Sequence, residues 1–299
     1  MTPAPDRGRT PRPEVTPGAG RERPPSRRML GGMTSNRSLE ALALTKTYGT
    51  ATSATHALLG VDLTIRTGES VAIMGPSGSG KTTLLHLLAG VLAPTAGDTL
   101  WGGRSLGSMS DKERTALRRQ DFGFVFQSGQ LLPELPADEN AALPLLLDGV
   151  ARPEATARAR QWLSHLGLGG MESRRPGELS GGQAQRVAIA RALVGSPGVI
   201  FADEPTGALD RTTGWEVMKA LTTAARAQGA SLVVVTHDLE VARWCRRIVE
   251  MRDGRIVREL SQTAGDGGTT AQPGAPEAPQ AHEPPQAHAV PTSFQAVTR

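Results

Sequence analysis

A run of eight residues, 75–82, constrains the fold of this chain more than any other part of its sequence. The run reads Gly-Pro-Ser-Gly-Ser-Gly-Lys-Thr and fits the phosphate-binding loop pattern G-x-x-x-x-G-K-[ST]. Before it, Ser70–Met74 predicts a short buried strand, and after it, residues 83–89 predict a helix that ends at Gly90. A strand, a glycine loop and a helix in this order direct backbone N–H groups toward polyphosphate. We therefore expect the chain to bind a nucleoside triphosphate.

Each residue type in this phosphate loop (residues 75–82) has its own task. The glycines let the backbone wrap the phosphates, Lys81 adds charge for the β- and γ-phosphates, and the Thr82 hydroxyl is placed to bind Mg²⁺. The predicted nucleotide-binding residues here are Gly75, Pro76, Ser77, Gly78, Ser79, Gly80, Lys81, Thr82 and Thr83.

Proline marks the boundaries of the folded part. Of the 22 Pro among the 299 residues, 13 stand in residues 1–36 and 261–299. Such segments bury too little apolar surface to order themselves, so we expect disordered tails at 1–36 and 261–299 and one folded domain at 37–260. The N-terminal tail carries a net charge of +4, the C-terminal tail −2 and the domain +2. A nearly neutral domain argues against nucleic acid as a partner.

The apolar and cysteine content indicates the compartment. Cys245 is the single cysteine, which excludes a disulfide within the chain and suits a reducing environment. No apolar run approaches the roughly 18 residues that a membrane span needs, and the arginine-rich N-terminus lacks the apolar core of a secretory signal. We expect a cytoplasmic protein whose membrane role, if it has one, is supplied by a partner chain.

The remaining patterns predict a fold around the loop. Alternating apolar residues predict strands at 39–45 and 57–65, hence a small antiparallel sheet, and residues 91–107 are short and turn-rich. Residues 131–170 are helical and punctuated by prolines, which indicates an inserted helical subdomain at about 128–195 with Trp162 on its buried face. The predicted fold class is α/β: a P-loop NTPase core with a mixed sheet, a small antiparallel β subdomain and an inserted helical subdomain.

Polar side chains follow three apolar strands of this core. Gln127 follows Phe122–Phe126, Asp203 and Glu204 end the strand at 198–202, and His237 follows Ser231–Thr236. Ligands of open α/β sheets bind at these strand ends, so an acidic pair that alone would be an ordinary turn becomes a candidate site. Thr82 and Asp203 suit Mg²⁺, and Glu204 is placed to polarise an attacking water.

A second glycine-started helix stands later in the chain. Residues 179–183 read Leu-Ser-Gly-Gly-Gln and are followed at once by a helical run from 184 to 193. Glycines before a helix make a second anion-binding helix end. We refer to residues 179–183 as the signature segment.

Taken in chain order, these motifs resemble the ATP-binding subunit of ABC transporters. The resemblance covers about residues 37–260 and is carried by residues 75–83, Gln127, the signature segment, residues 200–204, residues 208–210 and His237. Longer strings, including Phe-Val-Phe-Gln at 124–127 and residues 202–210, are similar to one branch. That branch contains the lipoprotein-release, macrolide/peptide-export and cell-division ATPases, which pair with four-span permeases.

The resemblance assigns a role to each motif residue. It implies that Tyr48 stacks on adenine, that Gln127 touches Mg²⁺ and relays nucleotide state to the permease, and that Lys81 acts in catalysis. Glu204 is implied as the general base, and His237 as a contact to the γ-phosphate. The resemblance also implies residues that close over an ATP held by the opposite subunit: Ser180, Gly181, Gly182 and Gln183. It implies that Asp210 bridges the dimer.

Two functions fit this family equally at the level of sequence. The first is an ATPase that binds ATP and Mg²⁺ and works as a homodimer on the inner face of the cell membrane. There it drives a separate permease of the export or lipoprotein-, peptide- or drug-extrusion type. The alternative is a non-transport ATPase that regulates a cell-envelope enzyme through a permease-like partner. DNA-repair and ribosome-acting relatives are disfavoured, because the chain has one cassette and no long heptad run.

Overall fold

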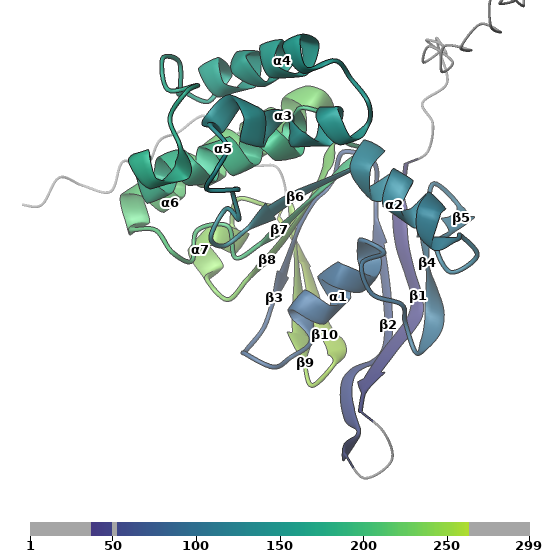
Figure 1. Cartoon of the computed structure of the whole chain (residues 1–299). Coiled ribbons are helices and arrows are strands. Elements are labelled where there is room, and N and C mark those ends of the chain that lie inside the picture. Colours follow the sequence, from purple (N-terminus) through teal and green to yellow (C-terminus); the bar gives the residue numbers. More distant parts are fainter. Residues whose placement is uncertain (1–36, 50–52, 263–299) are drawn as a thin grey trace, which may run out of the picture. The chain divides into compact units, whose positions relative to one another are not determined.

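The computed structural model describes residues 37–49 and 53–262 (Figure 1). Both predicted tails, 1–36 and nearly all of 261–299, therefore lie outside the described residues. Within the described part the strands form two sheets. A four-stranded antiparallel sheet has the order β2-β1-β4-β5, and its members are β1 (Leu39–Tyr48), β2 (Thr55–Ile65), β4 (Ala96–Trp101) and β5 (Arg104–Ser105).

The larger sheet is mixed, as predicted. Its order is β10-β9-β3-β8-β7-β6, and all neighbouring pairs are parallel except the hairpin of β9 and β10. Its members are β3 (Ser70–Met74), β6 (Phe122–Phe126), β7 (Val199–Asp203), β8 (Ser231–Thr236), β9 (Arg247–Arg252) and β10 (Arg255–Ser261).

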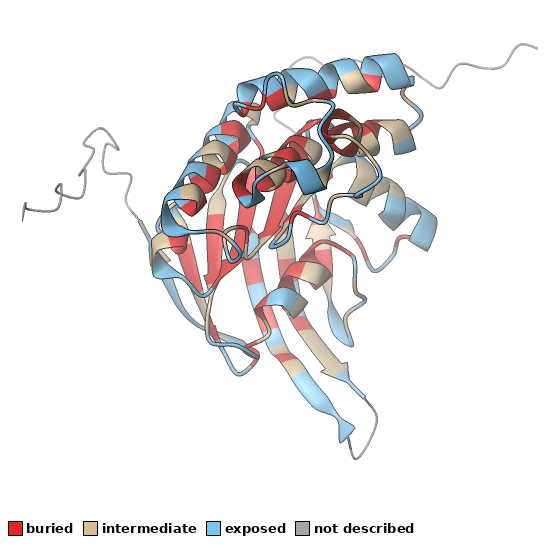
Figure 2. Ribbon diagram, turned by 60° about the vertical axis from the view of Figure 1, so that its left-hand side comes forward, coloured by how far each residue is buried: buried red, intermediate tan, exposed pale blue. Residues whose placement is uncertain are grey.

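Both faces of the central strands are covered, and Figure 2 shows these strands as almost entirely buried. Side chains alternate along β8: Leu232 and Val234 pack into one core, and Val233 and Val235 pack into the other. Helix α1 (Lys81–Leu88) lies between the two sheets, and helix α6 (Arg211–Gln228) packs on the opposite face of the larger sheet. Strands covered on both faces are continuous apolar runs, which explains why they were easy to predict.

The segment between α1 and the next helix, α2 (Asp111–Gln120), differs from the sequence expectation. Residues 91–107 were predicted to be turn-rich, yet they contain β4 and β5. Gly97 lies inside β4 with φ 85°, and a Cβ there would stand 2.4 Å from the Ala43 carbonyl oxygen. The glycine that indicates a turn in the sequence therefore permits close approach of β1.

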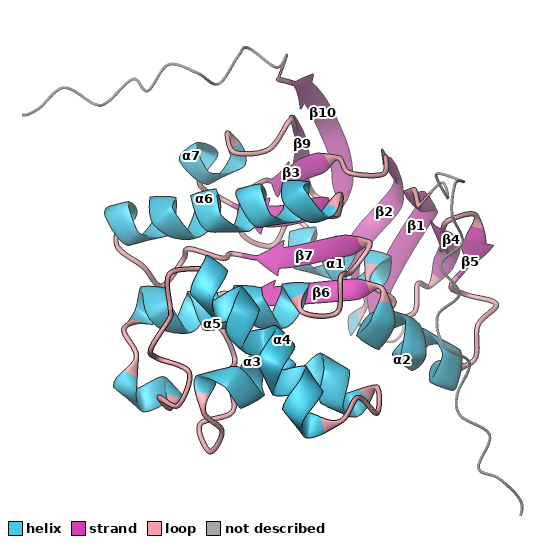
Figure 3. Ribbon diagram, turned by 90° about the horizontal axis from the view of Figure 1, so that it is seen from above, coloured by secondary structure: helices cyan, strands magenta, loops and turns pink. Residues whose placement is uncertain are grey.

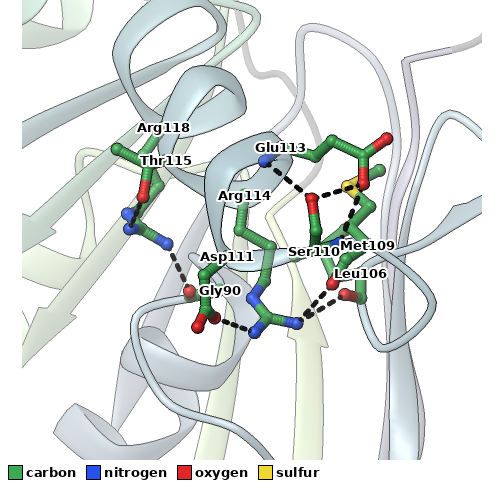
Figure 4. Close-up of polar contacts among 9 residues, drawn as sticks. All are labelled: Gly90, Leu106, Met109, Ser110, Asp111, Glu113, Arg114, Thr115 and Arg118. Carbon is green, nitrogen blue, oxygen red and sulfur yellow. Dashed lines mark hydrogen bonds and ion pairs between the residues drawn. The ribbon is translucent and has the colours of Figure 1, made fainter.

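Helix α2 (Asp111–Gln120) is fixed at both ends by polar contacts (Figure 4). Ser110 and Glu113 form a capping box, in which the Ser110 Oγ accepts from the Glu113 N–H at 3.3 Å and the Glu113 carboxylate accepts from the Ser110 N–H at 2.8 Å. Arg118 donates to the carbonyl of Gly90 at 2.7 Å, just beyond the end of α1. This bond ties α2 to the helix that begins in the phosphate loop.

The chain between β6 and β7 forms three α-helices and a 3-10 helix, Pro176–Glu178, and Figure 3 shows the three α-helices beside these strands. They are α3 (Ala137–Leu147), α4 (Arg152–His165) and α5 (Gly181–Leu193). In α4 the buried residues are Ala155, Ala159 and Leu163, while Trp162, expected on the buried face, is half-buried at its edge. No helix was assigned from the sequence to residues 211–228, which form the 18-residue α6.

Candidate functional site

The phosphate loop adopts a conformation that requires glycine. Gly75, Gly78 and Gly80 have φ of 153°, 79° and 95°. A Cβ at Gly75 would stand 2.2 Å from the Met251 carbonyl oxygen, and one at Gly80 would stand 2.4 Å from the Ala57 carbonyl oxygen. Gly80 also occupies the N-cap position of α1, where it supplies no side-chain acceptor. The first N–H groups of α1 are therefore left for a ligand.

A cavity of about 710 Å³ opens over this helix end. Lys81 is almost buried, 9% exposed, and its ammonium donates to the carbonyl oxygens of Gly75 at 2.8 Å and Pro76 at 2.9 Å. The loop thus holds a positive charge at the cavity wall. Of the predicted loop residues, Gly75 and Ser79 lie outside the lining, and those that line it are Pro76, Ser77, Gly78, Gly80, Lys81, Thr82 and Thr83.

The acidic pair lies at the carboxyl end of β7, beside the loop. The Thr82 hydroxyl lies 3.4 Å from the Asp203 carboxylate. Burial raises the pKa of Asp203, and the hydrogen bond from Thr82 and the charges of His86 and Lys81 only partly oppose it. A half-buried carboxylate next to a hydroxyl is a set of hard oxygen ligands that fits Mg²⁺.

Glu204 lines the cavity together with His237. Its φ is +46°, a left-handed conformation that non-glycine residues rarely adopt. Strand β8 holds it there: the Glu204 N–H donates to the Val235 carbonyl at 2.9 Å, and the Thr236 hydroxyl donates to its carboxylate at 3.4 Å. His237 Nδ1 lies 2.8 Å from the other carboxylate oxygen, and because a carboxylate only accepts, Nδ1 is the donor.

Two predicted residues lie at the margin of the site. The hydroxyl of Tyr48, at the end of β1, stands 3.5 Å from the Thr83 hydroxyl, and its ring is 40% exposed. Gln127 is exposed and lies against Gly207, where a Cβ would stand 2.8 Å from its amide nitrogen. Gly207 donates to the Glu204 carbonyl at 3.0 Å. Gln127 therefore contacts the turn that follows Glu204 and is not part of the cavity lining.

The signature segment lies away from this cavity. Ser180 caps α5 in a capping box with Gln183: its hydroxyl accepts from the Gln183 N–H at 3.3 Å, and the Gln183 amide oxygen accepts from the Ser180 N–H at 2.9 Å. Asp210 caps α6 in turn and accepts from the Thr213 N–H at 3.0 Å. A Cβ at Gly182 would stand 2.2 Å from the Thr213 side chain, so these two helix ends adjoin.

The cavity also contains residues that the sequence did not indicate. Ala57 of β2 lines it, and no local pattern marks a residue contributed by the separate antiparallel sheet. Thr236 donates a hydrogen bond to the Glu204 carboxylate. The sequence could have indicated this residue, because it ends an apolar strand directly before His237.

A glycine loop around a buried lysine, with an acidic pair at the end of a buried strand of the same sheet, defines a P-loop nucleoside triphosphatase. Residues 58–207 match the family described as ABC transporter. This chain belongs to the ABC transporter family, as an ATP-binding ATPase, which confirms the resemblance and the fold class expected from the sequence.

Named relatives and solved structures agree with this membership. A lipoprotein-releasing system ATP-binding protein, LolD, from Geobacter metallireducens is 45% identical over 74% of this chain and 98% of its own length. The macrolide export ATP-binding/permease protein MacB from Marinobacter nauticus is 47% identical over 74% of this chain but only 34% of its own length. The dimeric ATP-binding cassette MJ0796 in a post-hydrolysis state, bound to ADP and Pi, is 41% identical over 75% of this chain and 98% of its own, with a TM-score of 0.70.

Proposed function

We propose that two copies of this chain bind and hydrolyse ATP and thereby drive a separate membrane permease of the export or lipoprotein-, peptide- or drug-extrusion type. The observation that carries the dimer is the separation of two helix ends within one chain. The N-terminus of α1 faces the cavity, whereas the N-terminus of α5 contributes no residue to it. A solved neighbour with the same fold is dimeric, which supports a site completed by a second copy.

In the proposed complex the triphosphate of ATP occupies the cavity over α1. The loop N–H groups and Lys81 hold the β- and γ-phosphates, and Tyr48, with its ring half exposed beside Thr83, stacks on adenine. Lys81 then exchanges its contacts to Gly75 and Pro76 for phosphate oxygens. The charge of the phosphates is thus bound by groups that are already in place.

Glu204 acts as the general base in this proposal. Its carboxylate takes a proton from the attacking water, while Thr236 and His237 hold it in orientation. His237 also lines the cavity, so its ring is placed to contact the γ-phosphate. Thr82, Asp203 and Gln127 are the residues that would hold Mg²⁺, which when bound neutralises charge on the phosphate oxygens.

The opposite subunit supplies the second half of each site. Ser180, Gly181, Gly182 and Gln183 present the N-terminal end of α5 to the γ-phosphate bound by the other copy. Asp210 bridges the two subunits next to this end. Because Ser180 already caps α5 within its own chain, the segment arrives at the partner's nucleotide in a fixed conformation.

A groove of about 610 Å³ is the proposed contact for the permease. It is formed by residues of α2, β6, α3 and α5, and two strongly exposed apolar side chains line it, Leu147 (69%) and Val91 (49%). From the start of the helical subdomain, Gln130, Leu143 and Pro144 also line this groove.

In this proposal the protein is cytoplasmic and peripheral on the inner face of the membrane. No helix in the described ranges is long and apolar enough to cross a bilayer. The test is to reconstitute the chain with a candidate four-span permease of the same organism and to compare the ATPase rates with and without that partner. We expect the permease to change the rate, and Leu147→Asp to remove this response while the rate of the isolated chain stays unchanged. An ATPase rate indifferent to the permease contradicts the proposal.

A further inference from the structure

Another cavity, of about 500 Å³, is lined mainly by residues of α6 and shares no lining residue with the ATP site. Two indole rings dominate it, one from the first half of α6 and one from the residue that follows α7 (Leu239–Ala242) by two positions. We call it the tryptophan pocket, and its lining residues are Arg211, Thr212, Trp215, Glu216, Lys219 and Trp244.

The pocket has the features of a binding surface. Trp215 is 38% exposed, and the Arg211 guanidinium stands 5.6 Å from its ring centroid. Trp244 is half-buried against the core that α6 covers. Within the described residues, neither Arg211 nor Lys219 forms an ion pair or a side-chain hydrogen bond. Two indoles that line one pocket, with cations nearby that form no ion pair, suit an extended proline-rich segment that carries negative charge.

The chain itself carries such a segment, and it leaves the described structure beside the pocket. The Gln262 N–H donates to the Arg246 carbonyl at 2.7 Å, and Arg246 is two residues beyond Trp244. The following 37 residues, 263–299, contain three acidic residues and one arginine. Their net charge of −2 is opposite in sign to that of Arg211 and Lys219.

The spacing of prolines in this segment is regular. Prolines stand at 273, 276 and 279, which is every third position, and Glu277 lies among them. A polyproline II helix has three residues per turn, so prolines at this spacing fall on one face of it. Pro273 is eleven residues beyond Gln262, and eleven extended residues span at most about 40 Å, which leaves ample reach to a pocket that includes Trp244.

We propose that residues 273–279 of this chain bind in the tryptophan pocket of the same molecule as a polyproline II helix. The three prolines stack against Trp215 and Trp244, and Glu277 pairs with Arg211 or Lys219. A short tether raises the effective concentration to the millimolar range, so even weak stacking fills the pocket. This inference does not depend on the proposed function, because neither tryptophan belongs to the ATP site.

The test places a quencher in the segment of the full-length chain. Ala278→Cys is labelled with a nitroxide, which quenches tryptophan fluorescence at short range. Cys245 stays unlabelled, because it is buried and its burial raises its thiol pKa to about 12. We expect lower tryptophan emission in the labelled protein than in the unlabelled one, and we expect Trp215→Phe to remove part of this loss, because Trp244 still lines the pocket.

Matched proline substitutions separate the proposal from simple proximity. Changing Pro273, Pro276 and Pro279 together to Ala should restore the emission, whereas changing Pro284, Pro285 and Pro291 together, which lack the three-residue spacing, should leave the loss intact. Three results overturn the proposal. They are equal emission with and without the label, the same loss in both triple variants, and a loss that grows with protein concentration, which assigns the segment to a second copy.

Discussion

The two glycine-started helices of this protein share a sequence pattern but differ in how their N-termini are satisfied. Helix α1 begins after Gly80, which has φ 95° and offers no side-chain acceptor, and its end opens into a cavity. Helix α5 begins after Ser180, whose hydroxyl and partner Gln183 cap it within the chain. The uncapped end of α1 leaves its first N–H groups for phosphate, whereas at the end of α5 one of them, the N–H of Gln183, is already bonded to Ser180. The predictions below test this division, from the largest effect to the smallest.

The chemical step gives the largest effect. Glu204→Gln removes the carboxylate that takes the proton from water but keeps the size of the side chain. We expect the turnover rate to fall about 10²- to 10⁴-fold. Because both helix ends still engage ATP, a stable dimer should accumulate, measured by size-exclusion chromatography with light scattering. Glu154→Gln, on the outer surface of α4, is the matched control and should retain activity. A Glu204→Gln protein that stays monomeric with ATP contradicts closure of the dimer.

The uncapped end should account for ATP affinity in the monomer. Lys81→Ala deletes the cation that the loop holds at the cavity wall. A hydrogen bond to a charged group contributes about 1.5–3 kcal/mol, so ATP should bind about 10- to 100-fold more weakly. Calorimetric titration at concentrations where the protein is monomeric measures this. Unchanged affinity would place the triphosphate elsewhere.

The capped end should behave in the opposite way. Ser180→Ala removes the cap of α5 and should lower the free energy of unfolding by about 1 kcal/mol, measured by urea titration. The monomer's affinity for ATP should not change, because Ser180 does not line the cavity, but ATP-dependent dimer formation and turnover should fall. If monomer affinity falls as much as it does in Lys81→Ala, the two helix ends are not separate in function.

The smallest effects concern pH and distinguish the carboxylates beside the two ends. Burial raises the pKa of Asp203, so the charged carboxylate destabilises the nucleotide-free fold. Asp203→Asn should therefore be more stable than the unaltered protein at neutral pH. This difference in stability should fade as the pH falls through the raised pKa of Asp203.

Hydrogen bonds from Thr213 lower the pKa of Asp210. Its stabilisation is present above its unfolded-state pKa and is lost in acid, so Asp210→Asn should be less stable at neutral pH and equal in acid. Thermal unfolding at several pH values measures both stability changes. If both variants are stabilised, or both are destabilised, at neutral pH, the predicted difference between the two carboxylates is wrong.

Local sequence was sufficient wherever one segment determines its own structure. The phosphate loop and the apolar strands β3, β6 and β8 have the expected positions, because each carries its pattern within a few consecutive residues. The strand β4 was missed because Gly97 serves a contact with β1 that is distant in sequence. Helix α6 was missed although its buried residues, which include Gly214, Val217, Met218, Leu221 and Ala225, have helical spacing, because Gly214 and four threonines weaken the local signal.

The same limit applies to the site. Sequence placed Glu204 and His237 at the ends of separate strands, which indicates a shared edge, but it cannot show that their side chains touch. That contact depends on the parallel pairing of β7 with β8 and on the backbone turn at Glu204.

At Glu204 the backbone conformation that lowers stability belongs to the residue that activity requires. A non-glycine residue in this region costs on the order of 1 kcal/mol, which glycine would not incur. Glu204→Gly is therefore expected to yield a protein that folds at least as well and hydrolyses nothing. Directed evolution that selects for thermal stability alone would favour replacement of Glu204 and loss of the ATPase activity. Selection for activity must therefore accompany it.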